Sequence, residues 1–219
     1  MNIGVFLLAC CVSLTTALAQ AFPYQDARTR VAEWSKEAVS ISYAKPERKI
    51  EIPSPDGREK VLIQGVSLSV AMGGNRLRGT EDVGVSALAE LLWSSDSIAF
   101  AITESFGGEV GDWHVTVYMI EKGVVQRLAV SNEVVKSFKS YYRCTEPEEP
   151  NIGAITWLNG SRDLLLVAQV PPHSSCPEMG KVRGYLVEVP TGQITKEFDE
   201  KELRDLFGGC LGSRFKKRK

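Results

Sequence analysis

Short runs of alternating apolar and polar residues, separated by turn-forming residues, recur along most of the chain. They are clearest from about residue 87 to 143 and again from 152 to 208, where aliphatic and β-branched residues lead into glycine-containing turns. A period of two with glycine turns is typical of antiparallel hairpins. The pattern therefore predicts a mainly β protein, with several antiparallel strands in each of the two stretches.

The two stretches match each other at several points in the same order. Trp93 and Trp157, 64 residues apart, each follow an apolar approach and precede a polar turn and an aliphatic strand. Gly123 and Gly192, 69 residues apart, stand at equivalent hairpin turns. Such a fixed period indicates a repeated structural unit. We predict that the two tryptophans pack each unit against the next, because buried aromatic rings dominate core energetics.

Each stretch ends in a segment with helical spacing. The first is Asn132–Phe138, and the second follows Asp199, which forms a capping-box pattern with Glu202. A weaker third copy lies upstream, at about residues 50–86, without the tryptophan, and within it we expect Gly73–Gly84 to be a loop. The expected fold is an antiparallel β-repeat of two full units and one partial unit, with short helices ending the units.

The N-terminal residues are typical of a secretory signal. Residues 1–19 carry no charge, and small residues at their end predict cleavage after Ala19. A lipoprotein-type cleavage that attaches lipid to Cys10 is the alternative. Residues 20–49 form an N-terminal segment whose apolar spacing favours a short helix over Asp26–Ala38. No later run is long enough to cross a bilayer, so we expect a secreted or periplasmic protein without a transmembrane segment.

Three cysteines remain after such a cleavage, in a compartment that favours disulfides. Cys176 lies in a proline-rich excursion of the last unit, and Cys144 in the segment that links the two full units. The matching excursion of the preceding unit has no cysteine, so a bridge between Cys144 and Cys176 would pin the longer loop. A bridge between Cys176 and Cys210 is the alternative. With the first pairing, Cys210 keeps its thiol beside a flexible end.

That end is basic, although the formal net charge of the whole chain is only -1. Arg214 and Lys216–Lys219 place five positive charges within residues 211–219, which we expect to form a basic, disordered tail. Such a tail either contacts anionic lipid or a polyanion, or stays solvated. The overall balance gives no field that attracts nucleic acid, and we expect no nucleic-acid partner.

Two short segments resemble the strand-entry motif of TolB-type β-propeller repeats, namely Ser54-Pro55-Asp56-Gly57-Arg58 and Trp93-Ser94-Ser95-Asp96. Trp157–Ser161 and Cys176–Gly180 are similar to a turn and an excursion of uncharacterised bacterial secreted proteins. The resemblance implies four-stranded blades in a propeller-like domain over residues 50–210, with units at about 50–86, 87–143 and 152–208. Propellers close with about 4–8 blades. An open stack, a two-sheet packing and closure by self-association therefore remain open.

The chain offers few groups for catalysis or metal binding. Its two histidines are His114, which follows Asp112 and Trp113, and His173. Asp112 and His114 would share one face of a strand as an acid–base pair, but no nucleophile motif accompanies them. His173 and Cys176 supply at most two of the about four ligands that zinc requires. We expect no metal, no cofactor and no catalysis.

The expected function is binding of an unknown envelope or extracellular protein through loops, since loops carry function on rigid β scaffolds. The candidate loops are Gly73–Gly84, Ser105–Trp113 and Pro171–Gly180, and the candidate residues in or beside them are Asp112, Trp113, His114 and His173. Two alternatives remain. One is a secreted hydrolase with an Asp/His-centred site. The other is a structural repeat that associates into a homo-oligomer through exposed strand edges.

Overall fold

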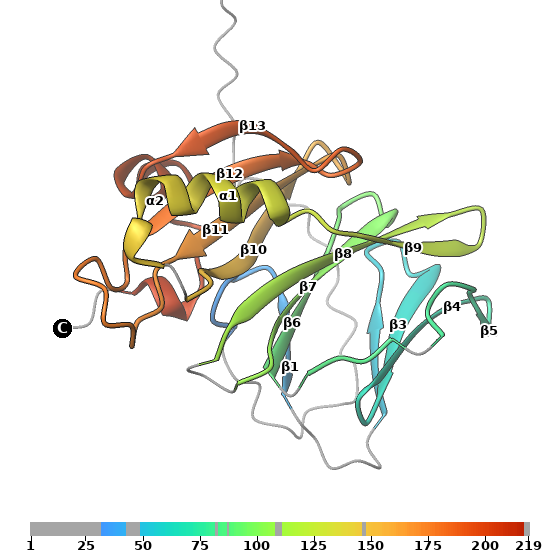
Figure 1. The fold of residues 1–219 in the computed structure, drawn as a ribbon. Helices are drawn as coiled ribbons and strands as arrows, with labels where there is room; N and C mark the ends of the chain where they lie inside the picture. The colour runs from blue at the N-terminus through green and yellow to red at the C-terminus, as the bar shows by residue number, and fades with distance from the viewer. Residues whose placement is uncertain are drawn as a thin grey trace, which may run out of the picture.

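The computed structural model describes residues 32–42, 49–81, 83–86, 88–107, 111–145 and 148–216. The expected signal sequence, its cleavage site and Cys10 lie outside the described residues. Within them the chain is mainly β and forms three antiparallel sheets that follow one another along the molecule (Figure 1). The described residues form no closed propeller.

The three sheets are meanders of neighbouring strands. The first sheet consists of β2 (Lys49–Pro53), β3 (Glu59–Gln64), β4 (Ser67–Met72) and β5 (Asn75–Arg76). The second consists of β6 (Leu88–Trp93), β7 (Ala99–Ser105), β8 (Trp113–Glu121) and β9 (Val124–Leu128), with β1 (Val39–Ser42) added along β6. The third consists of β10 (Asn151–Leu158), β11 (Asp163–Gln169), β12 (Val182–Glu188) and β13 (Gln193–Phe198).

A helix follows each of the last two sheets, α1 (Asn132–Tyr141) and α2 (Glu200–Phe207). The Asp199 side chain accepts the N–H of Glu202 at 2.8 Å, and the Glu202 side chain accepts the N–H of Asp199 at 3.1 Å, so the predicted capping box is confirmed. Two 3-10 helices complete the elements, η2 (Arg143–Thr145) and η3 (Ser213–Phe215). The two stretches that match in sequence thus share one succession of four strands and a helix.

The first unit is more complete than predicted. Gly73–Gly84 was expected to be a loop, yet it contains β5, so the first sheet has four strands and the expectation of a partial unit is wrong in this respect. Gly73 and Gly74 make the tight turn because glycine adopts positive φ without steric cost. Beyond β5 the chain reaches the second sheet, where the N–H of Val125 donates to the Arg78 carbonyl at 2.8 Å.

The polar turn between the first and second strands has the same construction in the first two sheets. Ser54 donates its hydroxyl to Asp56 at 2.8 Å, and Ser94 donates to Asp96 at 2.7 Å. Each aspartate also accepts a backbone N–H two residues further on, at 3.1 Å. These local side-chain bonds explain why Ser and Asp recur in the motif. We refer to these turns, and to residues 159–162 of the third sheet, as the entry turns.

The entry turns contact one another. The Ser97 hydroxyl accepts the N–H of Asp56 at 3.1 Å, which joins the first two turns. The Asp96 carboxylate accepts the N–H of Ser161 at 2.8 Å, which joins the second and third. All three turns therefore lie at the same end of the array, and the loops between the second and third strands lie at the other end.

Apolar clusters fill the space between successive sheets. Between the first and second sheets they include Val61, Leu68, Val70, Leu91, Phe100 and Ile102. Between the second and third sheets they include Val117, Phe138, Leu164, Leu166, Tyr185 and Val187. Trp93 packs against the first cluster, 5.0 Å from Phe100 between ring centroids. Trp157 packs against the second and donates its Nε1–H to the Leu92 carbonyl at 3.0 Å. Each of these half-buried tryptophans therefore lies between its own sheet and the preceding one.

The outer face of the first sheet is polar. Residues that alternate with the buried Ile52 and Val61 include Glu51 and Lys60, which form an ion pair at 2.7 Å. Lys49 also pairs with Glu51, at 2.8 Å, and the two lysines lower the pKa of Glu51 to about 2. A face of this composition needs no further sheet to cover it.

The outer face of the third sheet is apolar and is covered by α2 together with both ends of the described chain. Residues 32–38 and 210–216, which we call the terminal clasp, run side by side. The N–H of Lys36 donates to Cys210, that of Gly212 to Trp34 and that of Arg214 to Glu33, at 2.8–2.9 Å. Their apolar residues join one cluster with the sheet and α2, which includes Trp34, Trp113, Leu165, Phe198, Leu203, Phe207, Cys210, Leu211 and Phe215.

The terminal clasp corrects three expectations. Residues 32–38 form bends and turns rather than the end of a helix. Residues 211–216 are ordered by the burial of Leu211 and Phe215, so the expected disordered tail is wrong there, while residues 217–219 lie outside the described residues. Cys210 is buried in the apolar cluster and does not lie beside a flexible end.

Candidate interaction surface

The loops between the second and third strands of each sheet form one end of the array, which we call the loop end. They are Gly65–Val66 in the first sheet, residues 106–112 in the second and 170–181 in the third. Among its described residues, each loop has a large apolar side chain that is mostly in solvent. Val66 is 56% exposed, Phe106 74% and Met179 53%. The loop end therefore combines exposed apolar groups with anchorage on three packed sheets.

The loop of the second sheet has a narrow neck. Gly107 and Gly111 lie so close that a Cβ on either would overlap the backbone of the other. Phe106 stands at this neck, with its ring centroid 6.2 Å from that of His114. Residues 108–110 lie outside the described residues. Glycine is therefore required at both positions, because only glycine allows the two sides of the loop to approach so closely.

The predicted site residues of this loop do not all face solvent. Asp112 and His114 are exposed, as a binding loop requires. Trp113 is only 1% exposed, belongs to the apolar cluster on the third sheet, and donates its backbone N–H to Asn151 Oδ1 at 3.1 Å. Its assignment to a binding loop is therefore wrong, because alternation along β8 turns it away from its two neighbours.

The histidines form no catalytic constellation in the part of the chain that the structure describes. There, no hydrogen bond or ion pair joins His114 or His173 to a serine, a cysteine or a carboxylate. Glu104 pairs with His114 across β7 and β8, but its carboxylate accepts the N–H of Ser86 at 2.8 Å. Burial raises the pKa of Glu104 despite that hydrogen bond and the nearby Arg127 and His114.

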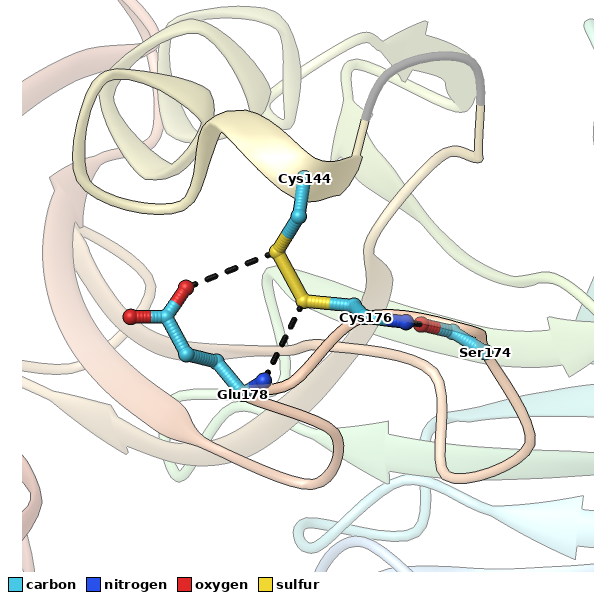
Figure 2. Close-up of a disulfide and its surroundings, with 4 residues drawn as sticks. All are labelled: Cys144, Ser174, Cys176 and Glu178. Carbon is cyan, nitrogen blue, oxygen red and sulfur yellow. Dashed lines mark hydrogen bonds between the residues drawn. A yellow bond between two sulfur atoms is a disulfide. The ribbon is translucent and has the colours of Figure 1, made fainter.

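The loop of the third sheet is held by the disulfide between Cys144 and Cys176, whose Cα atoms lie 5.4 Å apart (Figure 2). The predicted pairing is thereby confirmed over the alternative with Cys210. The bridge joins the loop to η2, just after α1. Ser174 accepts the N–H of Cys176 at 2.8 Å, and a Glu178 carboxylate oxygen lies 3.4 Å from Cys144 Sγ.

Backbone hydrogen bonds close the same loop at its base. The N–H of Val170 donates to Lys181 at 2.9 Å, and that of Gly180 donates back to Val170 at 3.1 Å. Within the loop, Met179 donates to Cys176 at 3.1 Å. Ligand atoms of Cys144, Cys176 and Glu178 gather within 4.8 Å, but the disulfide engages both sulfurs. The loop that presents His173 and Met179 is thus fixed by covalent and backbone bonds.

A polar cluster fastens α1 to the third sheet near this loop. Glu197 accepts hydrogen bonds from Ser137 at 2.7 Å and Tyr141 at 3.0 Å, and pairs with Arg183 at 3.4 Å. Burial opposes ionisation of Glu197, but these partners outweigh it and lower its pKa. The Arg183 guanidinium also lies 3.7 Å from the centre of the Tyr141 ring. Beneath them, burial raises the pKa of Tyr185 to about 12.

A second polar cluster anchors the terminal clasp to the second sheet, and the sequence interpretation missed it. Glu90 on β6 is 3% exposed, and its carboxylate accepts the backbone N–H groups of Glu33, Trp34 and Ser35. Arg214 pairs with Glu33 at 3.2 Å and donates to Gln169 on β11 at 2.7 Å. An acidic residue inside the apolar run of β6 is the sequence signal that points to such a buried partner.

Burial raises the pKa of Glu90, although the three backbone donors oppose the shift. The folded protein therefore holds this proton to a higher pH than the unfolded chain, and stability falls as pH rises from the ordinary carboxyl range of about 4.3 through the raised value. Urea denaturation between pH 4 and 8 should show wild type losing stability relative to Glu90→Gln across that window. A difference that stays constant or grows with pH would contradict the assignment.

Comparison with known proteins gives no relative. No family model, no curated protein and no solved structure matches the chain. Among the residues that the structure describes, no helix has the length and apolar character needed to span a bilayer. The function must therefore be inferred from the surface itself.

Proposed function

We propose that this protein is a non-catalytic binding module of the secreted or periplasmic space, and that it holds an envelope or extracellular protein through the loop end. The exposure of Phe106 carries the proposal. The Phe106 side chain is 74% exposed, next to the close approach of Gly107 and Gly111. Burial of this ring against a partner would contribute binding free energy, and aromatic anchors dominate interface energetics. Val66 and Met179 are exposed apolar side chains on the other two loops of the same end.

The scaffold supports this use of the loops. Three sheets with apolar clusters between them hold the loop bases, and the disulfide fixes the longest described loop before any partner arrives. Preorganised loops lose little conformational freedom on binding, which favours affinity. A disulfide also fits an oxidising compartment. Among the described residues of the loop end, no group supports the hydrolase alternative with equal strength.

The test combines capture with matched variants. The immobilised protein is exposed to envelope and culture fractions of its host, captured proteins are identified, and the affinity of each purified candidate is measured. Phe106→Ala should weaken binding by about 30-fold or more, as expected for an interface anchor. Ile98→Ala is the control, because Ile98 is 44% exposed but lies in an entry turn at the other end.

Three outcomes would overturn the proposal. Equal affinity of wild type and Phe106→Ala for the captured protein would remove Phe106 as the anchor. Concentration-dependent self-association would favour the structural repeat, if it is abolished by substitutions on β13, an edge strand of the third sheet. Hydrolysis of ester or peptide substrates that is lost on Asp112→Asn and His114→Gln would favour the enzyme.

A further inference from the structure

Positive charge gathers where the terminal clasp meets the end of α2. A hollow of about 180 Å³ opens there, and its three charged lining residues, Lys36, Arg204 and Lys216, are all basic. They come from three separate segments: the first half of the clasp, α2 and the second half of the clasp. Gly208, Leu211, Gly212 and Phe215 line the remainder.

Two of the three cations are held in place by the fold. Lys36 Nζ donates to the carbonyl oxygens of Gly208 and Gly209, at 3.3 and 3.1 Å. Arg204 donates to the Phe215 carbonyl at 2.9 Å and forms an ion pair with Glu200 at 2.9 Å. An ammonium group has three N–H donors and a guanidinium five, so both side chains keep donors for an additional acceptor. Lys216 is exposed and forms no ion pair with any residue that the structure describes.

The sequence extends this charge. Lys216 is followed by Lys217, Arg218 and Lys219, and with Arg214 these are five of the 26 basic residues of the chain. None of the 27 acidic residues lies in the same six positions. Arg214, the first residue of this run, forms an ion pair with Glu33 in the clasp at 3.2 Å, and Lys216 lines the hollow.

We propose that the surface around this hollow binds an anionic lipid bilayer, with a lipid phosphate group between Lys36, Arg204 and Lys216. A phosphate supplies the oxygen acceptors that these donors lack, and lysine and arginine are its usual partners. Each further cation near an anionic bilayer raises binding about fivefold. The oxidising compartment that the disulfide favours offers membrane surfaces rather than nucleic acid. The inference does not depend on Phe106 or the loop end.

Sedimentation with lipid vesicles tests the proposal, using the mature protein purified from its host. Vesicles of phosphatidylglycerol and phosphatidylcholine should bind the protein, and pure phosphatidylcholine vesicles should not. Raising the salt concentration from about 0.1 to 1 M should release it, because it shortens the Debye length threefold. The double variant Lys36→Gln/Lys216→Gln should bind about 25-fold more weakly, as two cations are lost.

The matched control is Lys122→Gln/Lys136→Gln, which removes the same charge from two lysines that are 89% and 81% exposed and that lie outside the clasp and α2. It should bind like wild type. Lys216→Gln alone, at an exposed position, guards against misfolding of the double variant. Absence of binding to anionic vesicles, equal weakening in both double variants, or equally strong binding of double-stranded DNA would each overturn the assignment to a lipid site.

Discussion

Replacing Trp34 with alanine is expected to lower the free energy of unfolding by about 3–5 kcal/mol, the range for truncation of a buried aromatic residue. Trp34 is fully buried, and its ring centroid lies 6.0 Å from that of Trp113 and 5.7 Å from that of Phe215. The Arg214 guanidinium lies 4.8 Å from the same ring. Truncation leaves a cavity at the centre of the terminal clasp and uncovers a buried charge, and urea denaturation measures the loss.

Trp93→Ala is the control for this prediction. It deletes the same side chain from a position that is half-buried and lies outside the clasp. Its cost should therefore be clearly smaller. Similar losses in the two variants would mean that Trp34 is not the centre of the clasp, and the explanation given for the outer face of the third sheet would fail.

Loss of the disulfide has the second large expected effect. The bridge closes a loop with a sequence separation of 32 residues. The chain-entropy model assigns a loop of this length about 3–4 kcal/mol, since the bridge restricts the unfolded chain. Cys144→Ser/Cys176→Ser should lower the free energy of unfolding by up to that amount. It should also increase proteolytic cleavage within residues 170–181, the loop that the bridge pins.

Reduction provides the control for this second prediction. A thiol reductant should lower the melting temperature of the wild-type protein and leave that of the double serine variant unchanged, because no bridge remains in it to reduce. An equal shift in both proteins would show that the reductant acts elsewhere. An absence of any shift in the wild type would show that the bridge does not stabilise the fold.

The local features of the fold were predictable from the sequence, because local chemistry specifies them. Alternation marked the strands of the two matched units, and Asp199 with Glu202 marked the start of α2. The pairing of Cys144 with Cys176 followed from comparison of the two units, and it is confirmed. The weak third copy was recognised from its entry turn, although the two-residue β5 was too short to show a pattern.

The remaining features depend on contacts between residues far apart in the chain, which periodicity does not reveal. β1 pairs with β6 across about fifty residues, and the clasp joins Trp34 to Gly212. Residues 211–219 were therefore predicted to be a disordered tail, although Leu211 and Phe215 within them are buried. Trp113 was included as the last residue of a candidate binding loop, although it is the first residue of β8 and is buried against the third sheet.

The central claim is that the terminal clasp covers the outer face of the third sheet, and amide hydrogen exchange tests it most directly. In the wild-type protein, the amides of Lys36, Gly212 and Arg214 should exchange as slowly as those of β11, since each donates to a backbone carbonyl across the clasp. In Trp34→Ala both halves of the clasp should become fast together. Rapid exchange of residues 32–38 and 210–216 in the wild type would contradict the account.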